Sequence, residues 1–445
     1  MKHSVLYKMK NILLINPPVY DFSAYDLWAK PLALLYLSSI LKKQNIHVQF
    51  FDYMDRLSDL IENTESDEYG CGHYIKEECP KPKIIDNIKR NYYRFGIPKN
   101  IAEKYLDTAD KPDVIIIGSI MTYWYFGVVE AAASLKKIFP DVPIILGGVY
   151  ATLCQEHAQN IPYINDVVSG GFYSLGPVLN KYGIEIGNVN SDFSNFPIPD
   201  YSFYKRLEYA ALRTNIGCPF NCSYCAQKIL NNKQHSFKSP YVIKDEIYEL
   251  VNSKKINNIV FYDDALLYNA NKHIKILFKE ILNDNKGFNF HTPNGLHAKF
   301  LDEELAELMF HVKLINPRFS LETADPYEQR YSDHKITSEE FKASIKILRQ
   351  AGYKNGEYTV YLLVGMHNQN ISNIKDSIKF AHDLGARISL SEYSPIPYTA
   401  SWAFIDDSLK NDPLCQNNTY FMSTNKNYDE LLKLKQFAKN LNNKL

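Results

Sequence analysis

Three cysteines lie within eight residues of this chain, at positions 218, 222 and 225. Thiolates are good ligands for iron–sulfur clusters and for zinc. A four-iron cluster normally takes four cysteines, so three would leave one iron open to a substrate or a second cofactor. The alternatives are a zinc site with His235 as fourth ligand and, as a different class, a non-catalytic metal-binding or sensory protein. The spacing of Cys218, Cys222 and Cys225 favours the open iron–sulfur cluster.

The elements around these cysteines follow a regular alternation of short apolar runs and amphipathic segments. Strands are predicted at 210–215, 258–262, 289–292, 318–321, 359–364 and 388–391. Helices are predicted at 242–253, 273–282, 302–310, 338–351 and 371–384, with Ser338 as an N-cap residue. Six such units predict an α/β fold, with a partial (β/α)6 TIM-type barrel over 207–400 and a short helical tail over 401–445.

Polar side chains follow several of the predicted strands. Asp263 and Asp264 come after the second strand, and His291, Asn294 and His297 lie at or just after the end of the third. The active site of such a barrel lies at the carboxyl ends of its strands, so these residues are candidates for cofactor or substrate binding. A helix N-cap is the alternative for the aspartates, and a structural role is the alternative for the histidines.

A second series of alternating predicted strands and helices precedes the cysteines, and it predicts a Rossmann-like parallel-sheet domain over 1–190. Its strands are predicted at 11–15, 47–51, 114–118, 143–146 and 166–168, and its main helices at 32–40 and 128–139. A polar insertion at about 55–111 is predicted as a helical excursion or as a lid or substrate-binding element. Residues 191–206 are predicted as a linker, because Pro197 and Pro199 resist both helix and central strand.

Composition limits the partners that we expect. Fifty basic and fifty acidic side chains cancel, so no net charge attracts nucleic acid or a membrane surface. A small molecule or a peptide is the expected substrate, and no membrane association is expected. Seven cysteines without an export signal indicate a cytoplasmic protein. The scattered Cys71, Cys79, Cys154 and Cys415 are interpreted as structural thiols.

The cysteine motif, with the aromatic Tyr224 before its last cysteine, resembles the signature of the radical S-adenosylmethionine (SAM) superfamily, and the resemblance covers about 207–399. It implies that Cys218, Cys222 and Cys225 bind a [4Fe-4S] cluster whose open iron binds SAM. The reduced cluster would then cleave SAM to a 5′-deoxyadenosyl radical, with flavodoxin or ferredoxin as electron donor. The resemblance implies that Tyr224 and residues 363–366 lie near the adenine of SAM and that Asp263, Asp264 and Glu322 are candidate SAM contacts. Asn294, at the end of its strand, is a further candidate for cofactor binding. His291 and His297 remain substrate candidates.

The first domain resembles the cobalamin (B12)-binding branch of the same superfamily. Ser119 and the turn Gly147-Gly148 lie where such folds hold cobalamin, and glycines would let the backbone approach the corrin. The resemblance implies cobalamin as an additional cofactor and methyl transfer to an unreactive carbon. The Asp-x-His-x-x-Gly loop of cobalamin folds is absent after the first strand. Cobalamin-independent cyclisation or rearrangement therefore stays open, with the domain as a scaffold.

Overall fold

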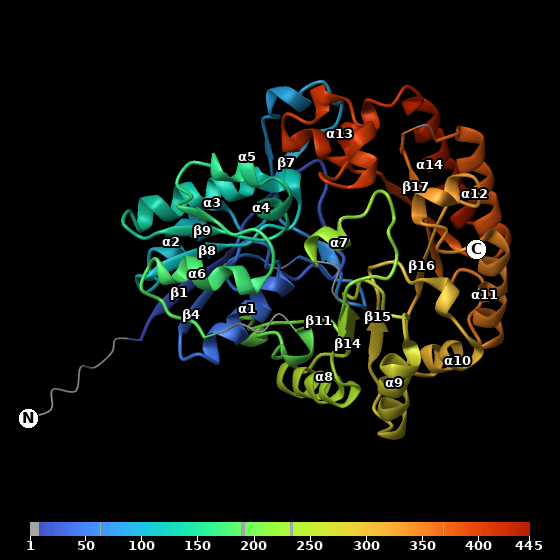
Figure 1. Ribbon diagram of the computed structural model, residues 1–445, viewed down its shortest axis with the longest axis horizontal. Coiled ribbons are helices and arrows are strands. Elements are labelled where there is room, and N and C mark those ends of the chain that lie inside the picture. Colours follow the sequence, from blue (N-terminus) through green and yellow to red (C-terminus); the bar gives the residue numbers. More distant parts are fainter. Residues whose placement is uncertain (1–8, 63, 188–191, 232–234, 368) are drawn as a thin grey trace, which may run out of the picture. The chain divides into compact units, whose positions relative to one another are not determined.

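The computed structural model describes residues 9–62, 64–187, 192–231, 235–367 and 369–445 (Figure 1). The chain divides into two compact units. Unit 1 comprises Met1–Asp67, Cys71–Pro82 and Lys89–Arg206, and unit 2 comprises Glu68–Gly70, Lys83–Ile88 and Leu207–Leu445. The domain boundary predicted at residues 190 and 191 lies outside the described residues.

Unit 1 is built on a five-stranded parallel sheet with the strand order β10-β9-β8-β1-β4. Its strands are β1 (Asn11–Asn16), β4 (His47–Asp52), β8 (Val114–Ile117), β9 (Ile144–Leu146) and β10 (Asp166–Val167). The three middle strands are almost entirely apolar and buried, as expected for parallel strands covered on both faces. The predicted Rossmann-like sheet is confirmed.

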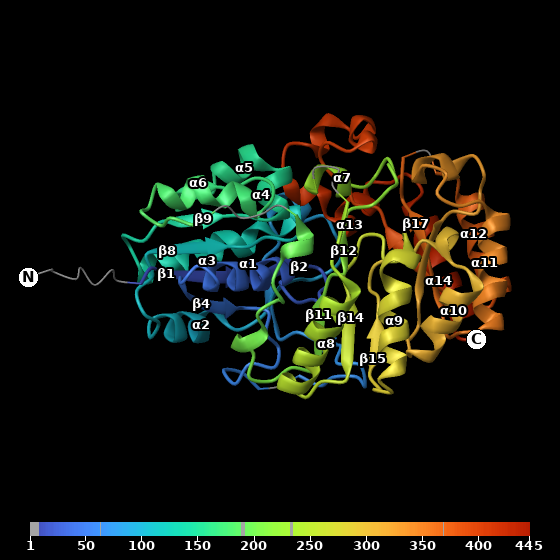
Figure 2. The same ribbon diagram turned by 60° about the horizontal axis from the view of Figure 1, so that its bottom comes forward.

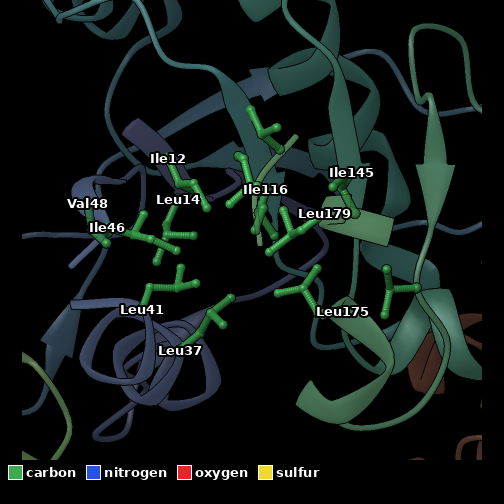
Figure 3. Close-up of a cluster of buried hydrophobic side chains, with 13 residues drawn as sticks. Ile12, Leu14, Leu37, Leu41, Ile46, Val48, Ile116, Ile145, Leu175 and Leu179 are labelled. Carbon is green, nitrogen blue, oxygen red and sulfur yellow. The ribbon is translucent and has the colours of Figure 1, made fainter. Parts of the chain in front are cut away.

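The helices of unit 1 cover both faces of this sheet (Figure 2). α1 (Leu32–Lys42) connects β1 to β4, while α3 (Tyr125–Ile138) connects β8 to β9 in the opposite direction along the sheet. Right-handed crossovers therefore place these two helices on opposite faces. Shorter helices follow, namely α4 (Val149–Leu153), α5 (Gln155–Gln159) and α6 (Leu175–Asn180). Figure 3 shows one half of the core, where alternate residues of the strands pack against α1 and α6.

The insertion contains short antiparallel strands and one α-helix, and most of its described residues lie outside regular elements, so the predicted helical excursion is wrong for most of its length. An antiparallel sheet has the order β2-β7-β6, formed by β2 (Val19–Asp21), β7 (Tyr92–Phe95) and β6 (Lys76–Cys79). β7 consists of three aromatic residues and an arginine, and aromatics favour strands. Smaller elements complete the region, namely β3 (Tyr25–Asp26), β5 (Gly72–His73) and α2 (Lys99–Leu106).

Unit 2 contains the six strands and five helices expected of the partial barrel (Figure 1). The strands are β11 (Tyr209–Leu212), β14 (Asn258–Phe261), β15 (Asn289–His291), β16 (Arg318–Glu322), β17 (Thr359–Val364) and β18 (Arg387–Glu392). They form two three-stranded parallel sheets, β11-β14-β15 and β16-β17-β18. An isolated parallel bridge between Leu296 and Phe319 lies between the two sheets. The intervening helices are α8 (Pro240–Lys254), α9 (Ile274–Asn283), α10 (Glu303–His311), α11 (Ser338–Gln350) and α12 (Ile371–Asp383).

The ends of these helices follow simple capping rules, with one correction. The N-cap of α11 is Thr337 and not Ser338, because Thr337 forms a reciprocal capping box with Glu340.

The tail forms α13 (Asn418–Ser423) and the predicted amphipathic helix, α14 (Tyr428–Asn442). Among the described residues, every helix is too short or too polar to cross a bilayer.

Candidate functional site

The three cysteines lie on a loop that follows the first barrel strand. Two short antiparallel strands, β12 (Asn215–Ile216) and β13 (Ser236–Phe237), pair at the base of this loop. The short helix α7 (Gln227–Leu230) begins directly after the last cysteine. We call residues 217–226 the cysteine loop. Its position after β11 places it at the carboxyl ends of the barrel strands, where the sequence predicts the active site.

A second loop, which follows β16, holds the cysteine loop in place. The backbone N–H of Ser223 donates to the carbonyl of Tyr331 at 2.8 Å, and the N–H of Asn221 donates to Asp333 Oδ2 at 2.8 Å. The Cys222 thiol lies 3.4 Å from the carbonyl oxygen of Ser332. Three consecutive residues of the cysteine loop are thus bonded to three consecutive residues of this segment, so the loop has a defined backbone.

The surroundings of the three thiols disfavour the free thiolate form. Burial, together with the charges of the neighbouring thiols, raises the pKa of Cys218 to about 11. Burial also raises the pKa of Cys222 and Cys225. Binding to iron stabilises the thiolate form that such surroundings otherwise disfavour. Across the described residues, no three His, Cys, Asp or Glu side chains converge on a single ion-sized point. His235, the alternative zinc ligand, packs instead against the rings of Phe237 and Tyr268.

Asp264 and Asp263 follow β14 and contact the start of the cysteine loop in different ways. Asp264 Oδ2 accepts hydrogen bonds from the Gly217 N–H at 3.0 Å and from the side chain of Asn231 at 3.1 Å. Its Oδ1 is buried without a hydrogen-bond partner among the described residues. Arg213 lies 3.9 Å from that oxygen. Asp264 therefore positions the residue before Cys218, and its second oxygen has Arg213 as a charged neighbour.

Asp263 is an internal anchor of the same region. Its Oδ1 accepts three hydrogen bonds, from the N–H and hydroxyl of Thr214 and from the N–H of Asn215, at 2.6–2.9 Å. Burial raises the pKa of this carboxyl to about 7, against the lowering effect of those bonds. Asn294 donates to the backbone carbonyl of Asp263 at 3.1 Å. These contacts bring the ends of β11, β14 and β15 together.

Glu322 ends β16 in a left-handed conformation, with φ of 70°. The ladder between β16 and β17 is irregular between Ser320 and Glu322, and such irregularities redirect side chains near active sites. The Glu322 carboxylate forms a buried ion pair with Lys335 at 2.8 Å. Lys335 was not identified from the sequence, since a single lysine within a loop carries no motif. It follows the Tyr331–Asp333 segment and brings a buried positive charge near Cys222.

Glu322 and Tyr224 line one small pocket together with the end of β17. The remaining lining residues come from the loop after β16 and the segment after β17, and the full set is Tyr224, Glu322, Thr323, Glu328, Tyr331, Ser332, Leu363, Met366 and Gln369. The Tyr224 hydroxyl is buried without a hydrogen-bond partner among the described residues. The structure thus brings together Tyr224, Glu322 and residues 363–366, which the sequence placed around SAM.

The two histidine candidates lie in different surroundings. His297 Nε2 lies 3.8 Å from Cys218 Sγ, whereas His291 Nε2 lies 2.9 Å from Asn258 Oδ1. Asn258 is the first residue of β14, and the His291 ring also packs against Tyr69 of the insertion, with ring centroids 5.0 Å apart. The structure therefore joins His297 to the cysteine loop and places His291 beside the amino end of a strand.

In unit 1, Ser119 and the two glycines meet at the carboxyl ends of β8 and β9. Ser119 Oγ donates to the Gly147 carbonyl at 2.7 Å, and the Val149 N–H donates to the Ser119 carbonyl at 2.8 Å. Gly148 has φ of 100°, and a Cβ there would lie 2.3 Å from the Ser119 carbonyl oxygen. A Cβ on Gly147 would meet no atom within 4 Å. The backbone conformation and the close Ser119 carbonyl thus require glycine at position 148. A side chain at position 147 would instead extend into open space.

The site and fold define a class of enzyme with a three-cysteine loop on an open β/α barrel. Residues 213–381 match the family model described as the radical SAM superfamily. These residues therefore form a radical SAM domain, which supports an enzyme and implies a [4Fe-4S] cluster and SAM as cofactors. Cys218, Cys222 and Cys225 lie within the matched range and are the ligands that we propose for the cluster.

Known proteins that resemble the chain belong to the same class. An uncharacterised methyltransferase of Pyrococcus horikoshii is 24% identical over 80% of this chain and 80% of its own length. The anaerobic magnesium-protoporphyrin IX monomethyl ester cyclase of Rubrivivax gelatinosus is 22% identical over 68% of this chain and 60% of its own length. Among solved structures, the radical SAM methyltransferase TsrM of Kitasatospora setae matches 90% of this chain and 76% of its own, with a TM-score of 0.66 at 14% identity. The cobalamin-dependent radical SAM enzyme OxsB matches 97% of this chain and 56% of its own, with a TM-score of 0.59 at 14% identity.

Proposed function

We propose that this enzyme transfers a methyl group, with the help of cobalamin, to an unreactive carbon of a small molecule or peptide. The observation that carries the proposal is the extent of the fold match. TsrM, solved with cobalamin and a [4Fe-4S] cluster, resembles 90% of this chain, a span too long for the radical SAM domain alone. The methyltransferase name of the Pyrococcus relative supports the same reaction class.

Within unit 2, Cys218, Cys222 and Cys225 would hold the cluster. When bound, the cluster supplies one electron to SAM, whose cleavage gives a radical that can abstract hydrogen from a carbon atom. Asp264 Oδ1 and the Glu322 carboxylate are the anionic groups for the SAM ammonium group, because both are buried at the carboxyl ends of the strands. Tyr224 and Met366 provide an aromatic and a thioether surface for the adenine. An electron donor such as flavodoxin or ferredoxin would be the partner.

Within unit 1, the open side of Gly147 is where a flat corrin could approach the backbone. Cobalamin, when bound, supplies the methyl group. The segment after β1 reads Asn16-Pro17-Pro18 and offers no imidazole to the cobalt. This segment would therefore provide no histidine ligand for cobalamin.

The experiment needs no knowledge of the substrate. Protein reconstituted anaerobically with iron, sulfide and cobalamin is reduced and mixed with SAM that carries a deuterated methyl group. The proposal expects bound methylcobalamin with that label, together with S-adenosylhomocysteine. Retention of the cluster without cobalamin binding would exclude this reaction and favour the second candidate.

That second candidate is cobalamin-independent radical cyclisation or rearrangement. The likeness to two magnesium-protoporphyrin ester cyclases, at 22% identity over 68% and 70% of this chain, favours the cyclisation part of this candidate. In this case the reduced protein should form 5′-deoxyadenosine, while the deuterated methyl group should leave as methionine. The two candidate reactions are thus distinguished by the product that carries the deuterated methyl group.

A further inference from the structure

His297 is held against the first cysteine by ring stacking. Its imidazole lies 22° from parallel with the Phe220 ring, with centroids 5.1 Å apart, and Phe300 packs beside it at 6.2 Å. The side chain is 8% exposed. This packing fixes the ring plane and leaves Nε2 3.8 Å from Cys218 Sγ, within the range of a hydrogen bond to sulfur.

The direction of this hydrogen bond follows from the chemistry of the sulfur. A cysteine that binds iron does so as a thiolate, which can only accept a hydrogen bond. A neutral imidazole carries its N–H on one of two nitrogens. His297 Nδ1 is buried and has no hydrogen-bond partner within the described part of the chain, so Nε2 is the nitrogen with an acceptor in reach and carries the proton.

The other two thiols have different surroundings. Cys222 Sγ faces the carbonyl oxygen of Ser332 at 3.4 Å, and Cys225 is the most exposed of the three. Among the described residues, Cys218 is the one cysteine of the loop with a side-chain N–H at hydrogen-bonding distance. Cys222 in turn is influenced by the Tyr224 hydroxyl and by Lys335, so Cys218 is the thiol of the loop that has an imidazole beside it.

We propose that His297 is a positioning residue that donates an N–H···S hydrogen bond to the Cys218 thiolate and so raises the reduction potential of the cluster. The inference rests on the proposed function in one respect, namely that the three cysteines bind a [4Fe-4S] cluster. Reduction adds negative charge that is shared by the ligand sulfurs, so a donor strengthens its bond in the reduced state. Hydrogen bonds to the sulfurs are among the factors that set cluster potentials.

Two substitutions test the N–H donor and the aromatic ring of His297 independently. His297→Phe keeps an aromatic ring for the stack with Phe220 and removes the N–H, whereas His297→Gln keeps an N–H and removes the ring. The measurement is a redox titration of the reconstituted cluster, followed by electron paramagnetic resonance. His382→Phe, in α12 and away from the cysteine loop, controls for the loss of a histidine as such.

We expect His297→Phe to lower the ratio of reduced to oxidised cluster about tenfold at a fixed potential, which is about 59 mV for one electron. His297→Gln should restore most of that ratio, and His382→Phe should match the wild type. A wild-type potential in His297→Phe would overturn the proposal, as would equal losses in both His297 variants. Iron content is measured in parallel. Wild-type protein without four irons per chain would instead refute the proposed function, so the two failures are distinguishable.

Discussion

The adjacent glycines 147 and 148 allow a test of cobalamin binding that does not confuse binding with folding. A side chain at Gly148 would collide with the Ser119 backbone, with its Cβ 2.3 Å from the carbonyl oxygen and 2.8 Å from the nitrogen. A side chain at Gly147 would enter open space. The two residues belong to the same turn, so Gly147→Val is the test and Gly148→Ala is the matched control.

The expected magnitudes differ for the two positions. Gly148→Ala places an L-residue at φ of 100° and ψ of −164°, a backbone region that is essentially confined to glycine and costs other residues about 1–3 kcal/mol. Overpacking typically costs about 1–3 kcal/mol more. The sum is a large part of the total stability of about 5–15 kcal/mol that is usual for a domain. Gly147 does not have a positive φ, so Gly147→Val should change the free energy of unfolding by less than about 1 kcal/mol.

The assay combines thermal unfolding with equilibrium dialysis against hydroxocobalamin. Gly147→Val should unfold near the wild-type temperature and lose cobalamin binding, while its iron–sulfur spectrum stays unchanged. Gly148→Ala should unfold at a lower temperature. Wild-type cobalamin affinity in a folded Gly147→Val protein would refute the reasoning, because the corrin could not then approach the backbone at Gly147.

Three further predictions concern unit 2. Cys222→Ala should lose both the brown colour of the cluster and SAM cleavage, measured by iron analysis and by the yield of 5′-deoxyadenosine. Asp263→Ala should lower the unfolding temperature more than Asp263→Asn, because alanine leaves three buried donors without an acceptor. The raised pKa of Asp263, about 7 against 3.8, means that the folded state binds more protons. The stability of the wild type, measured by urea unfolding, should therefore fall between about pH 4 and pH 7 relative to Asp263→Asn. Lys335→Met should destabilise the fold by about 3–5 kcal/mol, since Glu322 would be left as an unpaired buried charge, and adding Glu322→Gln should recover part of that loss in the same unfolding measurement.

The barrel elements were predictable because apolar residues recur along them at clear strand or helix spacing. The six predicted barrel strands and the five predicted barrel helices all lie within a few residues of their predicted ranges. The insertion was not predictable in the same way. Its strand β7 pairs in antiparallel fashion with β2 on one side and with β6 on the other. A polar strand such as β6 (Lys76–Cys79) has no apolar alternation of its own. Part of the insertion, Glu68–Gly70, belongs to unit 2, where Tyr69 packs against His291.

The candidate site was predictable where a motif fixes the spacing and unpredictable where the contacts are long-range. The cysteine spacing and the residues at strand ends identify Cys218, Asp264 and Glu322. No local pattern shows that Tyr331–Asp333 would be bonded to the cysteine loop, because these contacts join residues about 110 positions apart. The same holds for Lys335, whose role depends on the irregular end of β16.

The roles of the two aspartates show why residue type at a strand end is not sufficient to assign function. Asp263 and Asp264 are adjacent, and either could be the acid that contacts SAM. In the structure Asp263 Oδ1 has three donors, and its burial favours the neutral form. A neutral carboxyl attracts an ammonium group weakly. Asp263 Oδ2 and Asp264 Oδ1 are each buried without a hydrogen bond among the described residues, so this feature does not distinguish the two. Asp264 Oδ2 accepts a hydrogen bond from Gly217, the residue before Cys218. We therefore propose Asp264 as the contact for the SAM ammonium group, whereas Asp263 holds together the strand ends on which the site depends.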